Sequence, residues 1–141
     1  MSTETVVLDT SVVIKWFRQE EVLAEAALTW RERFLQGSAV LVVPDLMAYE
    51  IANVLAYKHD LTTEQVQEAA RSLFEMELDW AGPSAALSGR AIELSRAHGI
   101  TVYDGAFVAL AEALAARLIT ADRRLVDRTN SLAFVTFLGS V

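Results

Sequence analysis

Four acidic side chains stand in otherwise apolar stretches of this chain: Asp9, Glu50, Asp104 and Asp122. Asp9 and Asp122 each follow a short, mostly apolar run, residues 6–8 and 118–121, of the kind that forms a buried parallel strand. Ligand sites of open α/β sheets lie at the carboxyl ends of the strands. We therefore expect these two carboxylates to meet at one edge of a sheet.

Glu50 and Asp104 are predicted to lie on helices and to face inward. Glu50 falls inside the apolar sector of a helix over residues 45–58, and Asp104 opens a helix over residues 103–116 whose i+3, i+4 and i+7 positions are apolar. A carboxylate on an apolar face is costly unless it is paired or bound to a cation. Capping, the helix dipole or a solvated edge position explains each acid singly. Four such acids together favour one shared pocket.

Clustered carboxylates without His or Cys beside them favour a hard cation, Mg²⁺ or Mn²⁺. Such a site suits hydrolysis of phosphodiesters, because the cation binds a phosphate oxygen and lowers the pKa of a bound water. The acids can hold one ion or two, and a carboxylate that is not fully engaged can accept the proton of the water. Five basic residues follow the acid-bearing strand ends, and each is either a phosphate contact or ordinary surface charge: Lys15, Arg18, Arg123, Arg124 and Arg128.

Composition narrows the class of protein. The chain has 141 residues, a net charge of −7, 53% hydrophobic residues and no cysteine. These values predict a single globular domain over residues 1–141, in a reducing cytoplasm, with no signal peptide or membrane span. General nucleic-acid binders are usually basic. A phosphate-bearing partner must therefore meet a local basic patch, a bound cation or a basic second protein.

The apolar periodicity predicts an α/β fold in the order βααβ, a helical block, then βαβ. A capping box at Thr62 opens a helix in the block, with Phe74 among its inward-facing residues. The block over residues 61–97 is larger than simple alternation gives, and we favour a partner-binding surface there. The other predicted helices cover residues 11–17, 20–35, 84–98 and 123–128, and the strands cover residues 6–8, 39–43, 118–120 and 133–138.

The acids and their neighbours, in this order, resemble the PIN domain, and more narrowly the VapC-type toxins of toxin–antitoxin pairs. The resemblance spans essentially the whole chain, and it rests on four segments: Leu8-Asp9-Thr10-Ser11; Pro44 with Glu50 and Asn53; Tyr103-Asp104; and Thr120-Ala121-Asp122-Arg123-Arg124-Leu125.

The resemblance implies a three-layer α/β/α fold with a central parallel sheet of four to five strands. It implies a Mg²⁺- or Mn²⁺-dependent endoribonuclease, a hydrolase, that acts on RNA such as tRNA or rRNA. It also implies a homodimer and a cognate antitoxin that inserts a segment near the pocket. The residues carried over as metal-binding and catalytic are Asp9, Glu50, Asp104 and Asp122.

Smaller residues are expected to support this acidic quartet. The resemblance assigns hydrogen bonds within the site to Ser11 and Thr120, and the helical arc of Glu50 suggests that Asn53 orients that carboxylate. Thr10 is expected only to cap the helix that follows. Gly105 departs from the family pattern, in which Ala or Cys is usual, and we expect it to loosen the start of its helix.

Two alternatives stay open at this point. One is a PIN-like nuclease with a role in RNA processing, or with DNA as substrate. The other is a non-catalytic interaction module that keeps the acids for structure or for a regulatory metal. An adjacent antitoxin gene and growth arrest on expression would favour the toxin over both.

Overall fold

A five-stranded parallel sheet forms the centre of the molecule, in the order β3-β2-β1-β4-β5. The computed structural model describes residues 2–141. The inner strands are short apolar runs that are buried between two layers of helices, as a parallel sheet requires. The strands are β1 (Glu4–Leu8), β2 (Ala39–Pro44), β3 (Asp79–Ala81), β4 (Arg117–Thr120) and β5 (Val135–Phe137).

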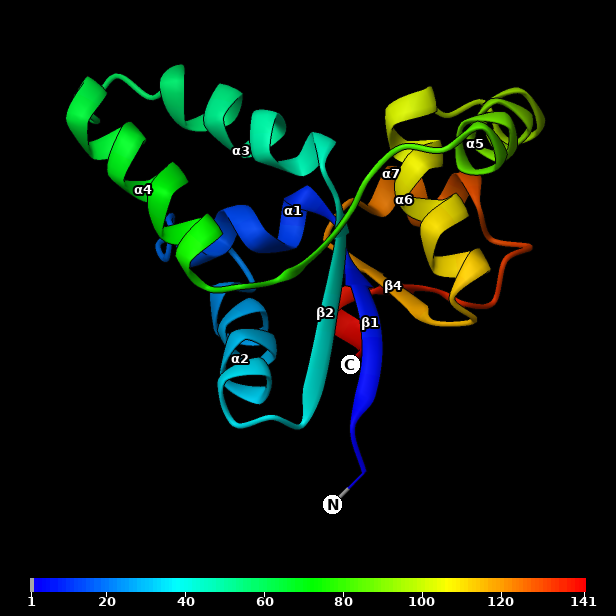
Figure 1. Cartoon of the computed structure of the whole chain (residues 1–141), viewed down its shortest axis with the longest axis horizontal. Coiled ribbons are helices and arrows are strands. Elements are labelled where there is room, and N and C mark those ends of the chain that lie inside the picture. Colours follow the sequence, from blue (N-terminus) through cyan, green and yellow to red (C-terminus); the bar gives the residue numbers. More distant parts are fainter. Residues whose placement is uncertain (1) are drawn as a thin grey trace.

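Helices cover both faces of the sheet, which confirms the predicted three-layer α/β/α fold (Figure 1). One layer holds α1 (Thr10–Val13), the short η1 (Ile14–Trp16), α2 (Ala24–Leu35), α3 (Leu46–Ala56) and α4 (Thr63–Glu75). The other layer holds α5 (Ala85–His98), α6 (Val102–Ala113) and α7 (Arg123–Arg128), and η2 (Leu138–Ser140) ends the chain.

The order of the strands places a crevice beside β1. The chain leaves β1 toward β2 and β3, and it returns through α5 and α6 to β4 on the other side of β1. Val6 to Leu8 pair with residues 117–119 of β4, so the carboxyl ends of β1 and β4 are level. Ligands bind at such a reversal of strand order because the two flanking connections diverge to opposite faces.

Apart from shifts of a few residues at the ends of other elements, two features differ from the sequence prediction. The helix expected from residue 20 begins at Ala24, because Leu23 adopts a left-handed conformation with φ of 67° and ends the preceding loop. Strand β3 was not predicted. It is three residues long and pairs with β2 at the edge of the sheet. Its segment, Asp-Trp-Ala, has no apolar alternation long enough to indicate a strand.

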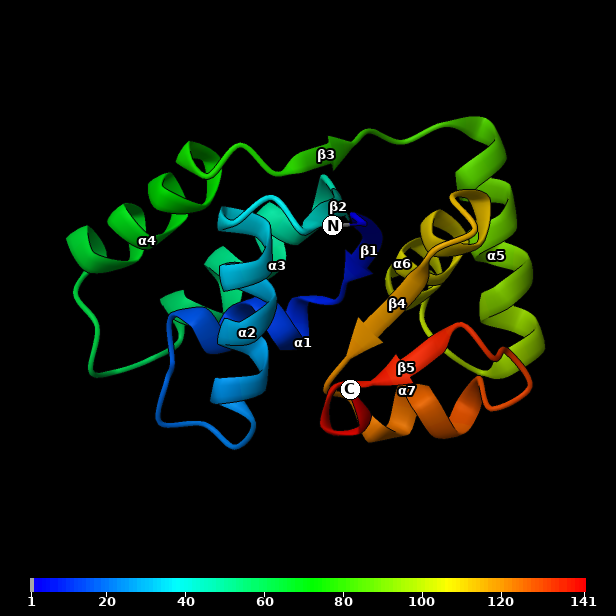
Figure 2. The ribbon, with the colours of Figure 1, turned by 90° about the horizontal axis from the view of Figure 1, so that it is seen from below.

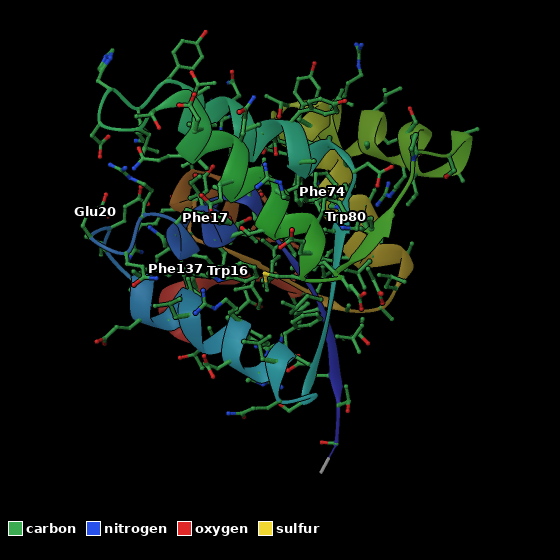
Figure 3. The ribbon with its side chains drawn as sticks, turned by 60° about the vertical axis from the view of Figure 1, so that its left-hand side comes forward. Trp16, Phe17, Glu20, Phe74, Trp80 and Phe137 are labelled. Atoms are coloured by element: carbon green, nitrogen blue, oxygen red, sulfur yellow. The ribbon has the colours of Figure 1, made fainter. Side chains whose placement is uncertain are left out.

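The helical block holds one confirmed and one wrong prediction. The capping box of α4 is present, since the side chains of Thr62 and Gln65 each bond the other's backbone N–H. Phe74 was predicted to face inward, but it is 56% exposed. Its ring stacks on Trp80 with the centroids 5.1 Å apart (Figure 3). The two rings cover one another at the margin of the core.

Gly105 packs α6 tightly against α5. A Cβ on Gly105 would stand 2.5 Å from the backbone oxygen of Ala91, a distance that real Cβ atoms do not show. The expected loosening of α6 is therefore wrong, because the missing side chain allows the two helices to approach closely. Figure 2 shows α5 and α6 side by side. Within residues 2–141, no helix is both long and apolar enough to span a bilayer.

Candidate active site

Asp9 lies at the end of β1 and is 6% exposed. Its Oδ2 accepts hydrogen bonds from the hydroxyls of Ser11 and Thr120 and a longer one, 3.4 Å, from the Ser11 backbone N–H. Asp9 is itself the N-cap of α1, so the prediction that Thr10 caps this helix is wrong. All of these bonds end on Oδ2, which leaves Oδ1 for another partner.

Ser11 and Thr120 connect the ends of β1 and β4. Ser11 Oγ accepts a bond of 2.9 Å from the backbone N–H of Ala121, and Thr120 Oγ1 accepts one of 3.0 Å from that of Asp122. The two hydroxyls lie 3.3 Å apart. These residues, far apart in the sequence, thus place the Asp9 carboxylate and the Asp122 backbone in one network.

Asp122 is the N-cap of α7, so the capping role that the sequence left open for it is present. Its Oδ1 accepts bonds from the backbone N–H groups of Arg124 (3.0 Å) and Leu125 (3.3 Å). The bonds to Oδ1 fix the direction of the carboxylate, because the helix N-terminus supplies both donors. Capping and a role in the site are therefore compatible for Asp122.

Glu50 approaches from α3 and is half-buried. Its Oε1 accepts a short bond, 2.6 Å, from the hydroxyl of Thr10. The prediction that Thr10 only caps a helix is thus wrong, since Thr10, which follows the end of β1, bonds a side chain of α3. In residues 2–141 no hydrogen bond connects Asn53 to Glu50, although both line one surface cavity. Orientation of Glu50 therefore comes from Thr10.

Asp104 lies in the first turn of α6, which is capped by the hydroxyl of Thr101. With Asp122 and Arg124 it lines a cavity of about 260 Å³. Arg128, one turn after Arg124 on α7, lines the same cavity and donates a hydrogen bond of 2.9 Å to the carbonyl of Gly99. The cavity thus has acids on its inner side and arginines along α7.

Burial and neighbouring charges raise the pKa values of three of the acids. Burial raises the pKa of Asp9, and the charge of Asp122 raises it further. Burial also raises the pKa of Glu50, against the Thr10 hydrogen bond, and the charges of Asp9 and Asp104 add to the rise. Burial, with the charges of Asp9 and Asp122, raises the pKa of Asp104 to about 6, although Arg124 opposes it. Negative charge therefore accumulates at one place and favours protons or a cation.

The carboxylates fit a hard divalent cation by chemistry and charge. In residues 2–141 no three His, Cys, Asp or Glu side chains stand close enough together to surround an ion directly. Mg²⁺ is usually bound through one or two carboxylates and keeps several waters, so the wider spacing of these acids is compatible with it. Asp9, with Oδ1 open, and Asp104, with a raised pKa, are the acids best placed to hold such an ion.

The basic residues divide into two groups. Arg18 pairs with Asp60 (2.9 Å) and Glu20 (2.8 Å), and Lys15 pairs with Glu21 (3.2 Å). Lys15 nevertheless lines a cavity of about 590 Å³ with Asp122, Arg123 and Arg124. Arg123 also lies over the ring of Phe137, 4.2 Å from its centroid. Phosphate contact is thus best supported for Arg123 and Arg124 and least for Arg18.

Residues 6–130 match the PIN domain family. The chain belongs to the PIN-domain family. It is 34% identical to Ribonuclease VapC3 of Pyrobaculum aerophilum over 131 residues. The aligned region covers 89% of this chain and 95% of that protein. The family predicted from the sequence is thereby confirmed, and the acids described above occupy the strand ends and helices of a PIN domain.

Solved structures share this PIN fold. A toxin–antitoxin complex from Klebsiella pneumoniae matches with a TM-score of 0.70 and 16% identity, over 94% of this chain and 97% of that one. VapC20 of Mycobacterium tuberculosis, a toxin that cleaves the sarcin–ricin loop, matches with a TM-score of 0.69 and 15% identity, over 92% and 96% of the two chains. At these identities the likeness concerns the fold.

Proposed function

We propose that this PIN-domain protein is an endoribonuclease of the VapC type, which hydrolyses RNA with a divalent cation, Mg²⁺ or Mn²⁺. The observation that carries the proposal is the convergence of four acids from β1, α3, α6 and the start of α7, whose burial and mutual repulsion raise the pKa values of three of them. Its relative of 34% identity is named a ribonuclease.

In this mechanism Asp9 and Asp104 would hold the cation, and Glu50 and Asp122 would complete the acidic site. A bound cation would supply positive charge for a phosphodiester oxygen and would lower the pKa of water. Thr10 engages Oε1 of Glu50, so Oε2 is free to accept the proton of the attacking water. Arg123 and Arg124 bind phosphates of the RNA beside Asp122.

The proposal includes partners. The structural neighbour from Klebsiella pneumoniae is a toxin–antitoxin complex, which supports an antitoxin for this chain. An antitoxin arginine would neutralise the acids of the pocket, as a cation does. We also propose a homodimer and a cytoplasmic location, where RNA, whether tRNA or rRNA, is accessible.

The test is cleavage of total RNA with added Mg²⁺ or Mn²⁺. Asp9→Asn and Asp104→Asn keep the shape of the side chain and remove its charge, so we expect each to lower cleavage by at least about 10³-fold, as losses of essential groups do. Asp127→Asn, an exposed aspartate of α7, is the matched control and should cleave like the parent protein. Equal cleavage by all four proteins would refute the assignment.

Expression in a host cell separates the alternatives. A toxin should arrest growth, and Asp9→Asn should relieve the arrest. Cleavage without arrest would favour a nuclease with a role in RNA processing. Calorimetric binding of Mg²⁺ or Mn²⁺ without cleavage of any RNA would favour the non-catalytic module.

A further inference from the structure

Two exposed tyrosines stand beside the acidic pocket and have no part in the mechanism above. Tyr49 directly precedes Glu50, and Tyr103 directly precedes Asp104. Their side chains are 83% and 65% exposed. A single exposed tyrosine is common, but here two of them come from different helices, α3 and α6, to the same cavity.

The two tyrosines line one cavity together with a residue of the acidic quartet. This cavity of about 350 Å³, called here the tyrosine slot, is lined by Leu46, Tyr49, Glu50, Asn53 and Tyr103. Residues 46, 49, 50 and 53 have the i, i+3, i+4, i+7 spacing of a single helix face. A ligand in the slot would therefore contact Glu50, a residue of the proposed active site.

The slot continues into an apolar cavity of about 390 Å³. Leu46, Tyr49 and Tyr103 line both cavities. Neither Lys nor Arg is among the residues that line either one, whereas α7 presents Arg123, Arg124 and Arg128 on the other side of the acids. The two sides of the pocket thus suit different parts of a nucleotide.

A single RNA strand carries phosphates on one side and bases on the other. The arginines of α7 attract the phosphates, while an aromatic wall without positive charge gives no advantage to a phosphate. Unpaired bases stack on tyrosine rings whatever their sequence, and an amide such as that of Asn53 can bond the edge of a base. The charge pattern therefore points to a base as the occupant of the slot.

We propose that the tyrosine slot binds an unpaired nucleobase of the RNA next to the bond that is cleaved. Tyr49 and Tyr103 supply the stacking surface, and Asn53 contacts the edge of the base. This inference rests on the proposed ribonuclease function and adds that the substrate is single-stranded at the cleavage position.

The first experiment compares tyrosine variants on one probe. The probe is a synthetic single-stranded RNA of 12 nucleotides centred on the bond that cleavage mapping of total RNA identifies. Tyr49→Leu and Tyr103→Leu should each lower kcat/KM by about 10-fold, within the range measured for loss of one stacked base. Tyr103→Phe keeps the ring and should keep activity. Tyr57→Leu is the matched control. Tyr57 lies at the C-terminal end of α3, is 77% exposed and lines neither cavity.

The second experiment changes the RNA and then combines that change with the tyrosine variants. An abasic ribonucleotide is placed in turn at each position flanking the cleaved bond of the same probe. At one position the parent protein should lose about 10-fold in kcat/KM. Tyr49→Leu and Tyr103→Leu should lose little more on that abasic probe, because the stacking partner is already absent.

The outcomes separate this inference from the proposed function. If the parent protein cleaves no RNA, both fail. If it cleaves, but the abasic probes or the Leu variants at positions 49 and 103 react like their controls, the slot does not bind a base while the ribonuclease stands. Light scattering tests whether a second copy of this chain, rather than a base, occupies the slot. A dimer that Tyr49→Leu or Tyr103→Leu converts to monomer would make this surface a contact between two copies and overturn the proposal.

Discussion

The acids at the strand ends and the acids on the helices are held in different ways. Asp9 and Asp122 have their carboxylates fixed by neighbouring residues, through the Ser11 and Thr120 hydroxyls and the first amides of α7. Glu50 has a single hydrogen bond, from Thr10, and depends on where α3 packs. The strand-end acids are therefore a rigid frame, and the helix acids are the adjustable part of the site.

Burial raises the pKa values of acids in both groups, Asp9 among them. Glu50 and Asp104 are half-buried and have raised pKa values, because desolvation adds to the repulsion of the neighbouring acids. The Asp122 side chain accepts its hydrogen bonds from the first amides of α7. We expect a bound cation to offset the repulsion between the helix acids and the strand-end acids.

The largest expected effect tests the rigid frame. Ser11→Ala removes the hydroxyl that bonds both Asp9 and the backbone of Ala121. Loss of a partner that orients a metal ligand typically costs about 10–100-fold in activity, and we expect kcat for RNA cleavage to fall by that much. Thr10→Val is the comparison and should cost less than about 10-fold, since one hydrogen bond to a half-buried group is lost. A larger effect of Thr10→Val would reverse the assignment of rigid and adjustable parts.

The next effect tests the ionisation of the helix acids. Asp104 must be charged to hold a cation, and its pKa is about 6, so cleavage should rise as the pH passes from 5 to 7, which spans about one unit on either side. More Mg²⁺ should move the midpoint to lower pH, because metal and proton compete for the carboxylate. A pH profile of cleavage at two Mg²⁺ concentrations measures this. A midpoint that does not move with the Mg²⁺ concentration would show that Asp104 does not bind the metal.

The same pKa has a consequence for stability without metal. A carboxyl whose pKa in the folded protein lies above its value of 3.8 in the unfolded chain favours folding most below 3.8 and loses that contribution as the pH rises to about 6. The melting temperature of the metal-free protein should therefore fall over this interval. Asp104→Asn should flatten the decrease, and melting curves of both proteins at matched pH decide it.

The smallest effect tests the packing that positions Asp104. Gly105→Ala forces a Cβ against the backbone of Ala91, and overpacking of this kind typically destabilises by about 1–3 kcal/mol. Gly89→Ala in α5 is the matched control, because nothing lies within 4 Å of its Cβ, and it should stabilise by about 0.5–1 kcal/mol. Urea unfolding measures both. Equal changes would show that the approach of α5 and α6 is not set by Gly105.

The sequence determined the class of fold, the family and the identity of the acids. Buried strands followed by Asp9 and Asp122 are recognisable because a parallel strand needs apolar residues on both faces and its ligand site lies at its carboxyl end. Glu50 and Asp104 are recognisable because each breaks the apolar stripe of a helix. The capping box at Thr62 is equally local, since its partner, Gln65, is three residues away. Each of these signals is local, because the residues that make it up lie within a few positions of one another in the sequence.

Tertiary structure alone decided which groups touch. The bond from Thr10 to Glu50 joins residues 40 positions apart, and the bond from Thr120 to Asp9 joins residues 111 apart. Strand β3 and the close approach at Gly105 likewise depend on neighbours brought in by the fold. Tyr49 and Tyr103 line the same slot only because α3 and α6 pack on either side of the strand ends. Periodicity reports which face of an element is buried, whereas the partner across that face is set by packing of the whole chain.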